Sequence, residues 1–185
     1  MFLIQFTTLS IRARISSLKN KKLNPTEWNR FFKEHYPPLS IPLAELKIEK
    51  REGLVKVFDR IRKNYFHLTD EEFVRQNFVA WMIDEYNYPP SIIANEIGID
   101  LNGTKKRCDT VVFSPNGSPF IIVEYKSPFV KITQEVFNQI VRYNMVLKAR
   151  YLIVSNGVAN YCCEIDYDNH SYRFLDSIPK YDKQN

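Results

Sequence analysis

Two Asn-Gly dipeptides constrain the fold of this chain more than any other feature. They separate three segments with strand character, SIIANEIGIDL, RCDTVVF and PFIIVEYK, which span residues 91–101, 107–113 and 119–126. Asn-Gly is the preferred pair at the centre of a two-residue type I′ turn, and such a turn joins antiparallel neighbours. The sequence therefore predicts a three-stranded antiparallel meander over residues 91–126.

These turns also determine which residues face each other across the meander. If the second Asn-Gly pair is at the centre of its turn, Asp109 lies opposite Glu124, and the same reasoning for the first pair puts Glu96 opposite Asp109. Both assignments depend on loop length, because a one-residue slip turns a carboxylate to the other face of the sheet. The prediction is a row of three carboxylates on one face.

A row of like charges needs compensation. Like charges directly opposite on neighbouring strands destabilise a sheet by a few tenths to about 1 kcal/mol. Lys126 follows Glu124 by two residues, shares its face and supplies one positive charge. A divalent cation with oxygen ligands, such as Mg²⁺, would supply the rest. The alternatives are that Glu124 and Lys126 form a structural ion pair or a solvated strand end, and that Glu96 is an exposed residue.

Helices are predicted on both sides of the meander. Residues 69–86, TDEEFVRQNFVAWMIDEY, have the apolar spacing of an amphipathic helix, and Thr69 with Glu72 forms a T-x-x-E capping box that accounts for Glu72. Residues 132–149 form a second helix, capped by Thr133, and the buried strand RYLIVSNG follows it. The order helix, meander, helix, strand predicts an α/β fold with a mixed β-sheet flanked by helices.

The proline-rich stretch YPPLSIPL divides the chain into two parts. Residues 1–36 are predicted to form an N-terminal basic arm or an added helix capped by Thr26, and residues 37–185 a compact domain. Residues 1–63 hold 14 Lys and Arg against 6 Asp and Glu, within a net charge of +5 for the whole chain. This balance permits a polyanionic partner.

Composition excludes several classes of protein. No apolar run approaches the ~18 residues of a membrane-spanning helix, and no basic segment precedes the short apolar start, so we expect a cytoplasmic protein without a membrane span. The three cysteines, Cys108, Cys162 and Cys163, have no C-x-x-C spacing. They are therefore predicted to be buried thiols rather than disulfides or a zinc site.

Several motifs resemble those of a known nuclease superfamily. Asp109 and the strand-end triplet Glu124-Tyr125-Lys126 resemble the D…(D/E)-x-K signature of PD-(D/E)XK, or restriction-endonuclease-like, nucleases. Gln139 and Tyr143 look like the Q-x-x-x-Y motif of RecB-type nucleases, whose members share one helical face. The strings EEFVRQNFVAWMIDEYNYP, KRCDTVVF, IIVEYKSP, FNQIVRYN and LIVSNG together resemble the N-terminal nuclease domain of type I restriction enzyme R subunits.

This resemblance implies a restriction-endonuclease-like core that cleaves DNA with a divalent metal. Asp109 and Glu124 would ligate Mg²⁺ or Mn²⁺, the backbone carbonyl of Tyr125 would be a third ligand, and Glu96 would be an additional acidic member. Lys126 would orient or deprotonate the attacking water and offset charge on the phosphate.

The resemblance also implies a role for the second helix and a set of partners. Gln139 and Tyr143 would position the nucleic-acid backbone or support the metal ligands, the alternative being the polar face of a surface helix. The partners would be DNA and restriction-modification or helicase subunits. Nearby basic residues would contact phosphates or remain ordinary surface charges. They are Lys105, Lys106, Arg107, Lys131 and Arg142.

Two departures from the family pattern affect this reading. Cys108 stands where the superfamily signature has proline, and the sequence contains no G-x-x-x-x-G-K-[ST] loop of a motor domain. The expectation is therefore a stand-alone form of the nuclease module. The alternatives are a non-catalytic nucleic-acid-binding or partner-docking module on the same fold, and a plain interaction protein whose charges form salt bridges.

Overall fold

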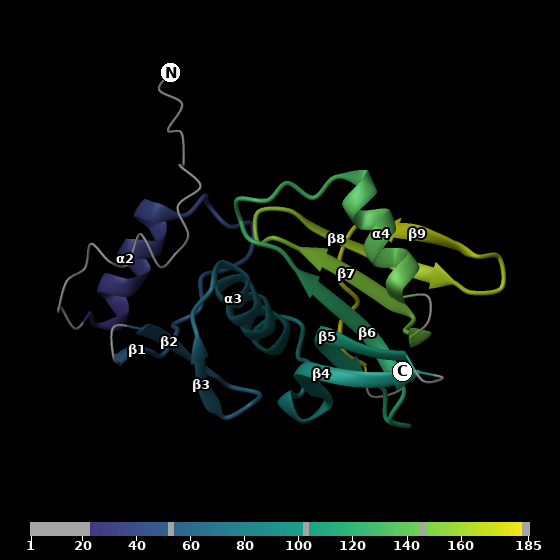
Figure 1. Ribbon diagram of the computed structural model, residues 1–185, viewed down its shortest axis with the longest axis horizontal. Helices are drawn as coiled ribbons and strands as arrows, with labels where there is room; N and C mark the ends of the chain where they lie inside the picture. Colours follow the sequence, from purple (N-terminus) through teal and green to yellow (C-terminus); the bar gives the residue numbers. More distant parts are fainter. Residues whose placement is uncertain (1–22, 52–53, 102–103, 145–146, 183–185) are drawn as a thin grey trace, which may run out of the picture.

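The computed structural model describes residues 23–51, 54–101, 104–144 and 147–182. Over these residues, two sheets lie on either side of a central helix (Figure 1). The helices are α2 (Pro25–His35), the central α3 (Asp70–Asp84), α4 (Gln134–Asn144) and the short 3₁₀ helix η1 (Pro90–Ile92). The small sheet has the order β1 (Ile48–Arg51), β2 (Leu54–Asp59), β3 (Asn64–His67). The large sheet has the order β4 (Ile93–Leu101), β5 (Thr104–Phe113), β6 (Pro119–Tyr125), β7 (Tyr151–Ser155), β8 (Asn160–Asp166), β9 (Ser171–Leu175).

The large sheet confirms the predicted α/β fold with a mixed sheet. Strands β4, β5 and β6 form the expected antiparallel meander. Strand β7 pairs with β6 in parallel, and α4 lies in the connection between them. A parallel pair needs such a crossover, which explains why a helix had to follow the meander. Strands β8 and β9 extend the sheet beyond the predicted elements.

Both hairpins of the meander have the predicted register. Asn95 pairs with Thr110 on one side, and Thr110 pairs with Val123 on the other. In the first hairpin, Leu101 pairs with Thr104 across an Asn-Gly pair that lies outside the described residues.

The second hairpin reaches its register through a different turn from the one predicted. The N–H of Gly117 donates to the carbonyl of Ser114 at 2.9 Å, so Pro115 and Asn116 are the central turn residues, not Asn116 and Gly117. Gly117 follows with φ +82°, a conformation that glycine adopts without steric strain. An extra residue in β6, Phe120, then shifts the pairing back, because Phe113 pairs with Pro119 and Val112 with Ile121. The turn adds one residue, and the bulge absorbs it.

Apolar layers cover both faces of the large sheet. On one face Val74 and Phe78 of α3 pack against β6 and β7, and on the other Phe137 and Ile140 of α4 pack against the same strands. Along β6 the buried residues alternate between the two layers, with Ile122 on the α4 side. The side chain of Glu124, two residues after Ile122, therefore leaves the sheet on the α4 side.

Helix α3 is enclosed rather than amphipathic, which corrects the sequence prediction. Every residue from Glu72 to Ala80 is buried. The large sheet covers one side of the helix, while Phe73 on the other side joins a cluster with α2 and the small sheet. The apolar spacing identified only the first of these contacts, because the small sheet was not predicted.

Helix α2 is packed onto the small sheet by its aromatic residues. Trp28, Phe31 and Phe32 are buried against the small sheet and Phe73. The side chain of Asn24 accepts from the N–H of Glu27, and the Glu27 carboxylate accepts from the N–H of Asn24, each at 2.9 Å. The N-cap is thus Asn24 and not Thr26, because Pro25 is well suited to the first helical position.

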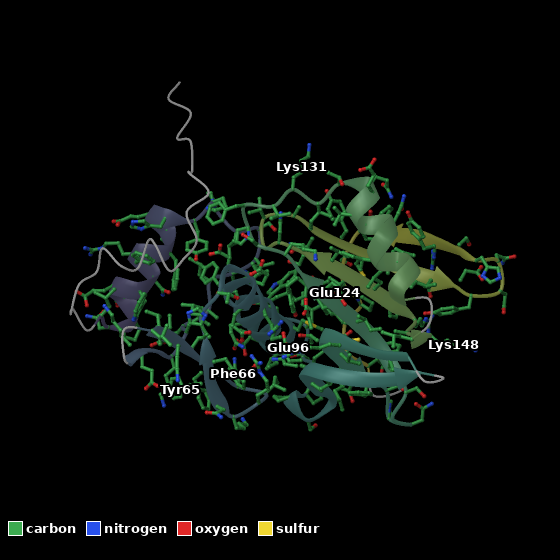
Figure 2. All side chains as sticks on the ribbon, in the orientation of Figure 1. Tyr65, Phe66, Glu96, Glu124, Lys131 and Lys148 are labelled. Carbon is green, nitrogen blue, oxygen red and sulfur yellow. The ribbon has the colours of Figure 1, made fainter. Side chains whose placement is uncertain are left out.

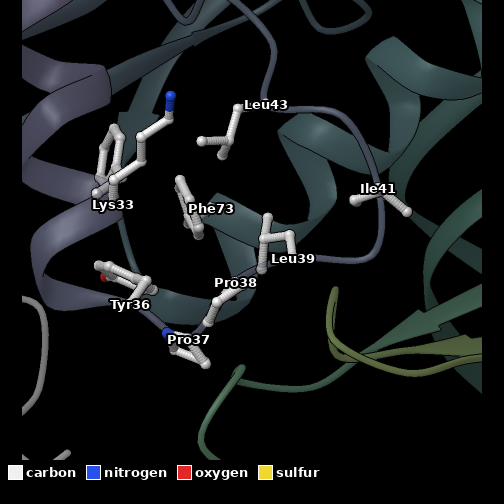
Figure 3. A pocket seen from close by; sticks show the side chains of 9 residues that line it. Lys33, Tyr36, Pro37, Pro38, Leu39, Ile41, Leu43 and Phe73 are labelled. Carbon is white, nitrogen blue, oxygen red and sulfur yellow. The ribbon is translucent and has the colours of Figure 1, made fainter. Parts of the chain in front are cut away.

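The proline-rich stretch leaves an apolar pocket of about 430 Å³ beside α2 (Figure 3). Its wall includes Tyr36, Pro37, Leu39 and Phe73. The backbone N–H of Ser40 donates to the carbonyl of Gly157 at 2.8 Å, which fixes this stretch to the loop after β7. The division of the chain at this stretch stays a prediction.

The cysteines match their predicted role. Cys108, Cys162 and Cys163 are buried thiols. Burial raises the pKa of both Cys162 and Cys163 to about 12, so these thiols stay protonated at neutral pH. None of the described helices is long and apolar enough to span a membrane.

Two glycines with left-handed backbone provide a matched test of packing. Gly157 has φ +79° and a Cβ there would lie 2.9 Å from the side chain of Leu39, whereas Gly117 has φ +82° and open space around it. Both Gly→Ala variants should lose ~1–2 kcal/mol in the free energy of unfolding from the backbone conformation. We expect Gly157→Ala to lose more than Gly117→Ala in urea denaturation, because Leu39 must also move. Equal losses would show that the contact with Leu39 is unimportant.

Candidate active site

Arg75 of α3 lies at the centre of the acidic cluster. Its side chain is 4% exposed and contacts carboxylates from three different elements. Nη1 donates to Glu72 of the same helix at 2.6 Å, and Nη2 donates to Asp109 of β5 at 3.2 Å and to Glu96 of β4. One guanidinium therefore supplies much of the compensation that the sequence analysis assigned to a metal ion.

Glu72 connects Arg75 to the small sheet. Its second oxygen accepts from Arg62 at 2.6 Å and from Gln76 at 2.8 Å. Arg62 also donates to Asp59, the last residue of β2, at 2.5 Å. The backbone N–H of Glu72 does donate to the Thr69 hydroxyl, as a helix cap requires, but its carboxylate is used by the arginines. Capping thus explains Thr69 and does not explain Glu72.

The network returns to the large sheet through uncharged side chains. Asn95 donates to Asp59 at 2.9 Å, the hydroxyl of Thr110 donates to Asn95 at 2.7 Å, and the hydroxyl of Tyr125 donates to Thr110 at 3.2 Å. The backbone N–H of Tyr125 donates to Asp109 at 2.8 Å, and Asp109 contacts Arg75. The contacts form a closed ring that joins α3, both sheets and the end of β6.

The pKa shifts follow from this ring. Burial acts to lower the pKa of Arg75, but Glu72, Asp109 and Glu96 outweigh it and the pKa is raised. Burial acts to raise the pKa of Asp59, and hydrogen bonds from Arg62 and Asn95 outweigh it, so the pKa is lowered. Both groups are therefore charged at neutral pH. Burial raises the pKa of Tyr125, whose hydroxyl stays protonated.

Asp109, in the middle of β5, lies beside the Glu124-Tyr125-Lys126 triplet at the end of β6. The backbone pairing of β5 with β6 stops at Thr110 with Val123, and beyond it the Asp109 carboxylate accepts the N–H of Tyr125. The N–H and C=O of one strand residue point to the same neighbouring strand, so the Tyr125 carbonyl faces the Asp109 side. The backbone N–H of Lys126 donates to Ser155 of β7 at 2.9 Å.

Glu96 occupies the position opposite Asp109 with an unusual backbone. Its φ is +55°, and the pairing passes from Asn95 with Thr110 directly to Ile97 with Cys108. A left-handed residue interrupts the strict alternation of side chains, which is why Glu96 can reach Arg75 on the α3 side. Its carboxylate also contacts the exposed Arg107. Figure 2 shows Glu96 and Glu124 in the central part of the molecule.

For most of the other predicted site residues, the structure describes the backbone but not the side chain. Gln139 and Tyr143 belong to α4, four residues apart, but their side chains lie outside the described part of the structure. The same holds for the side chains of Lys105, Lys106 and Arg142, whereas Lys131 is exposed.

The oxygen donors of Asp109 and of the end of β6 fit a hard divalent cation. Asp109 is 26% exposed and Glu124 is half-buried, and both offer carboxylate oxygens beside the carbonyl edge of Tyr125. Mg²⁺ is usually held by one or two carboxylates, with waters and substrate phosphate completing the shell. Among the described residues, no group of three or more His, Cys, Asp or Glu has the geometry of a metal site. A site here would thus depend on oxygen ligands from the main chain, water and substrate.

A comparison with protein families identifies the relatives of this chain. Residues 70–179, more than half of the chain, match the family described as type I restriction enzyme R protein N terminus. The chain belongs to this family. The match confirms the resemblance seen in the motifs, although it begins at α3 rather than near residue 40. No curated protein matches the chain.

The R protein N-terminal family match includes Glu72, Arg75 and the meander, and it excludes the small sheet with Arg62. Sequence reasoning missed Arg75 as part of the site. A signal was present in the string FVRQNFV, where three polar residues interrupt an apolar helix and all three are buried. Buried charges in such a position require partners, and Arg75 is the residue that brings them together.

The ring predicts an acid-dependent stability at Asp59. Because its folded pKa lies below 3.8, the contribution of its ionised form is complete above that pH and is lost as the pH falls further. We expect Asp59→Asn to reduce the free energy of unfolding by ~3–5 kcal/mol at pH 7, since Arg62 loses a buried partner. The deficit relative to wild type should shrink below about pH 4.

Urea denaturation between pH 7 and pH 3 measures this effect. Asp84→Asn is the matched control, because Asp84 also pairs with an arginine, Arg60, but both side chains are at least half exposed. A loss for Asp59→Asn no larger than that for Asp84→Asn would contradict the role of the ring.

Proposed function

We propose that this protein is a divalent-metal-dependent DNA endonuclease that hydrolyses phosphodiester bonds. The observation that carries the proposal is the contact of Asp109 with the backbone of the Glu124-Tyr125-Lys126 triplet, at 2.8 Å between Oδ2 and the Tyr125 nitrogen. Membership of the type I restriction enzyme R protein N-terminal family supports it.

Asp109 and Glu124 would hold Mg²⁺ or Mn²⁺, with the Tyr125 carbonyl as a third oxygen ligand and Glu96 as an outer acidic member. Bound there, the cation would lower the pKa of a water molecule and stabilise charge on the phosphate. The N–H of Tyr125 and the guanidinium of Arg75 orient the Asp109 carboxylate. Ser155 fixes the backbone at Lys126.

Lys126 would then act on the reacting groups. Its half-buried side chain follows Glu124 by two residues, so it can orient the attacking water, help to deprotonate it, and offset charge that develops on the phosphate. Gln139 and Tyr143, one helical turn apart on α4, would position the DNA backbone. As partners we propose DNA and the other subunits of a restriction-modification system.

A second candidate is a non-catalytic nucleic-acid-binding module on the same fold. The observation that favours it is the compensation of Glu96 and Asp109 by Arg75, because two of the three carboxylates then need no metal for a stable fold. This candidate predicts DNA affinity that is independent of divalent metal and of Lys126.

Cleavage assays distinguish the two candidates. The protein should cut plasmid, linear duplex or single-stranded DNA with Mg²⁺ or Mn²⁺, and Lys126→Ala and Asp109→Asn should each reduce the rate by ~10²-fold or more. Circular dichroism checks that the variants stay folded. Lys180→Ala is the control, since Lys180 is an exposed lysine outside the set predicted to contact phosphates and should leave the rate unchanged.

The contrary outcome has two parts. If the wild-type protein cuts none of these DNAs with either metal, the endonuclease proposal is lost. If it still binds DNA in chelator, with equal affinity in Lys126→Ala, the non-catalytic module takes its place.

A further inference from the structure

Arg75 makes contacts of unequal length with the carboxylates around it. Its bond to Glu72 is 2.6 Å, whereas its distance to Asp109 is 3.2 Å, and Nη2 also donates to Glu96. Asp109 is also the most exposed of the three carboxylates, at 26% against 7% for Glu72 and 18% for Glu96. The contact with Asp109 is therefore longer than that with Glu72 and the most accessible to solvent of the three, which makes it the easiest to break.

The guanidinium is anchored well enough to stay in the cluster without Asp109. Glu72 of α3 and Glu96 of β4 accept hydrogen bonds from it, and its Cζ lies 5.6 Å from the centroid of the Tyr125 ring. Its Nε is buried, and no acceptor for it is found among the described residues. Arg75 is thus held by its two terminal nitrogens, both of which are directed at carboxylates.

A divalent cation on Asp109 would have to share that carboxylate with this guanidinium. Positive charges a few ångströms apart repel strongly where side chains are buried and the local dielectric is low. A guanidinium cannot relieve the repulsion by losing its proton, because arginine stays charged in proteins. The repulsion can fall only if Arg75 releases Asp109 or if further negative charge, such as a substrate phosphate, enters the site.

We propose that Arg75 competes with the divalent cation for Asp109 and so weakens metal binding by this protein in the absence of DNA. The inference rests on the proposed function, because it takes Asp109 as a metal ligand. It adds that Arg75 is a positioning residue, which holds Asp109 in the metal-free protein and yields it when the cation binds. Metal and DNA phosphate should consequently bind with positive coupling.

Arg62 offers a matched control for Arg75. Both are arginines that donate to Glu72, and the Arg62 side chain is only 15% exposed, but its other partner is Asp59 and not Asp109. Removing either residue deletes one positive charge from the same ring. Only the removal of Arg75 deletes the charge that contacts Asp109.

Calorimetric titration of Mn²⁺ into the metal-free protein tests the proposal. Arg75→Gln should bind Mn²⁺ at least about tenfold more tightly than wild type, while Arg62→Gln and the charge-conserving Arg75→Lys should stay within about threefold of it. Adding Asp109→Asn to Arg75→Gln should abolish the gain. Tighter binding in Arg62→Gln equal to that in Arg75→Gln, no gain in Arg75→Gln, or no Mn²⁺ binding by any variant would overturn the proposal.

The loss of a buried ion pair can unfold Arg75→Gln, and thermal denaturation covers that case. Since a ligand that binds the folded state raises the melting temperature, Mn²⁺ should raise that of Arg75→Gln more than that of Arg62→Gln. If Arg75→Gln is unfolded without metal, Mn²⁺ should restore its circular dichroism spectrum, and failure to do so would overturn the proposal.

These readouts are separate from cleavage. A protein that cuts no DNA but shows the Arg75→Gln gain would refute the proposed function alone. A protein that cuts DNA without the gain would refute only the role of Arg75.

Discussion

The arrangement of this protein depends on one guanidinium shared by three carboxylates. Arg75 lies in the middle of a helix that both sheets enclose, where an uncompensated charge would be very costly. Glu72, Glu96 and Asp109 come from three elements to surround it. Their mutual repulsion would separate β4 from β5 at this point, and Arg75 converts that repulsion into a link between the strands and the helix.

The same contacts determine how rigid the candidate site is. Asp109 is fixed from two directions, by Arg75 and by the N–H of Tyr125, while the backbone at Lys126 is tied to β7. The bond from the Tyr125 N–H keeps Asp109 in place even when Arg75 yields it, so the carboxylate needs little rearrangement when charge develops on a substrate. A buried polar network of this kind stabilises the fold only when every member has a hydrogen-bond partner. One buried group without a partner destabilises the whole network.

The sequence predicted the meander and its registers because local chemistry determines both. Asn-Gly turns and alternating apolar residues need no distant partner. The register survived even where the turn around Asn116 was of another type, because a bulge in β6 compensated. Glu72 shows where this reasoning ends. A helix cap and a buried ion pair have the same T-x-x-E pattern, and only the contacts of Glu72 with Arg62 and Arg75 in the folded structure distinguish them. The short strands β1 and β3, IEKR and NYFH, lack an apolar alternation that a pattern could detect.

The region that matches the family is smaller than the unit that the contacts around α3 hold together. The matched region starts at residue 70, yet Glu72 takes one of its two arginines, and Asn95 its carboxylate partner, from the loop and strand just before it. A fragment trimmed to the shared region would keep the acidic residues of the cluster and discard a cation that neutralises them. It would also uncover Phe73, which α2 and the small sheet shield from water. The segment outside the family pattern is therefore an integral half of the electrostatic and apolar shell around α3, and relatives that lack it must supply equivalent partners from elsewhere.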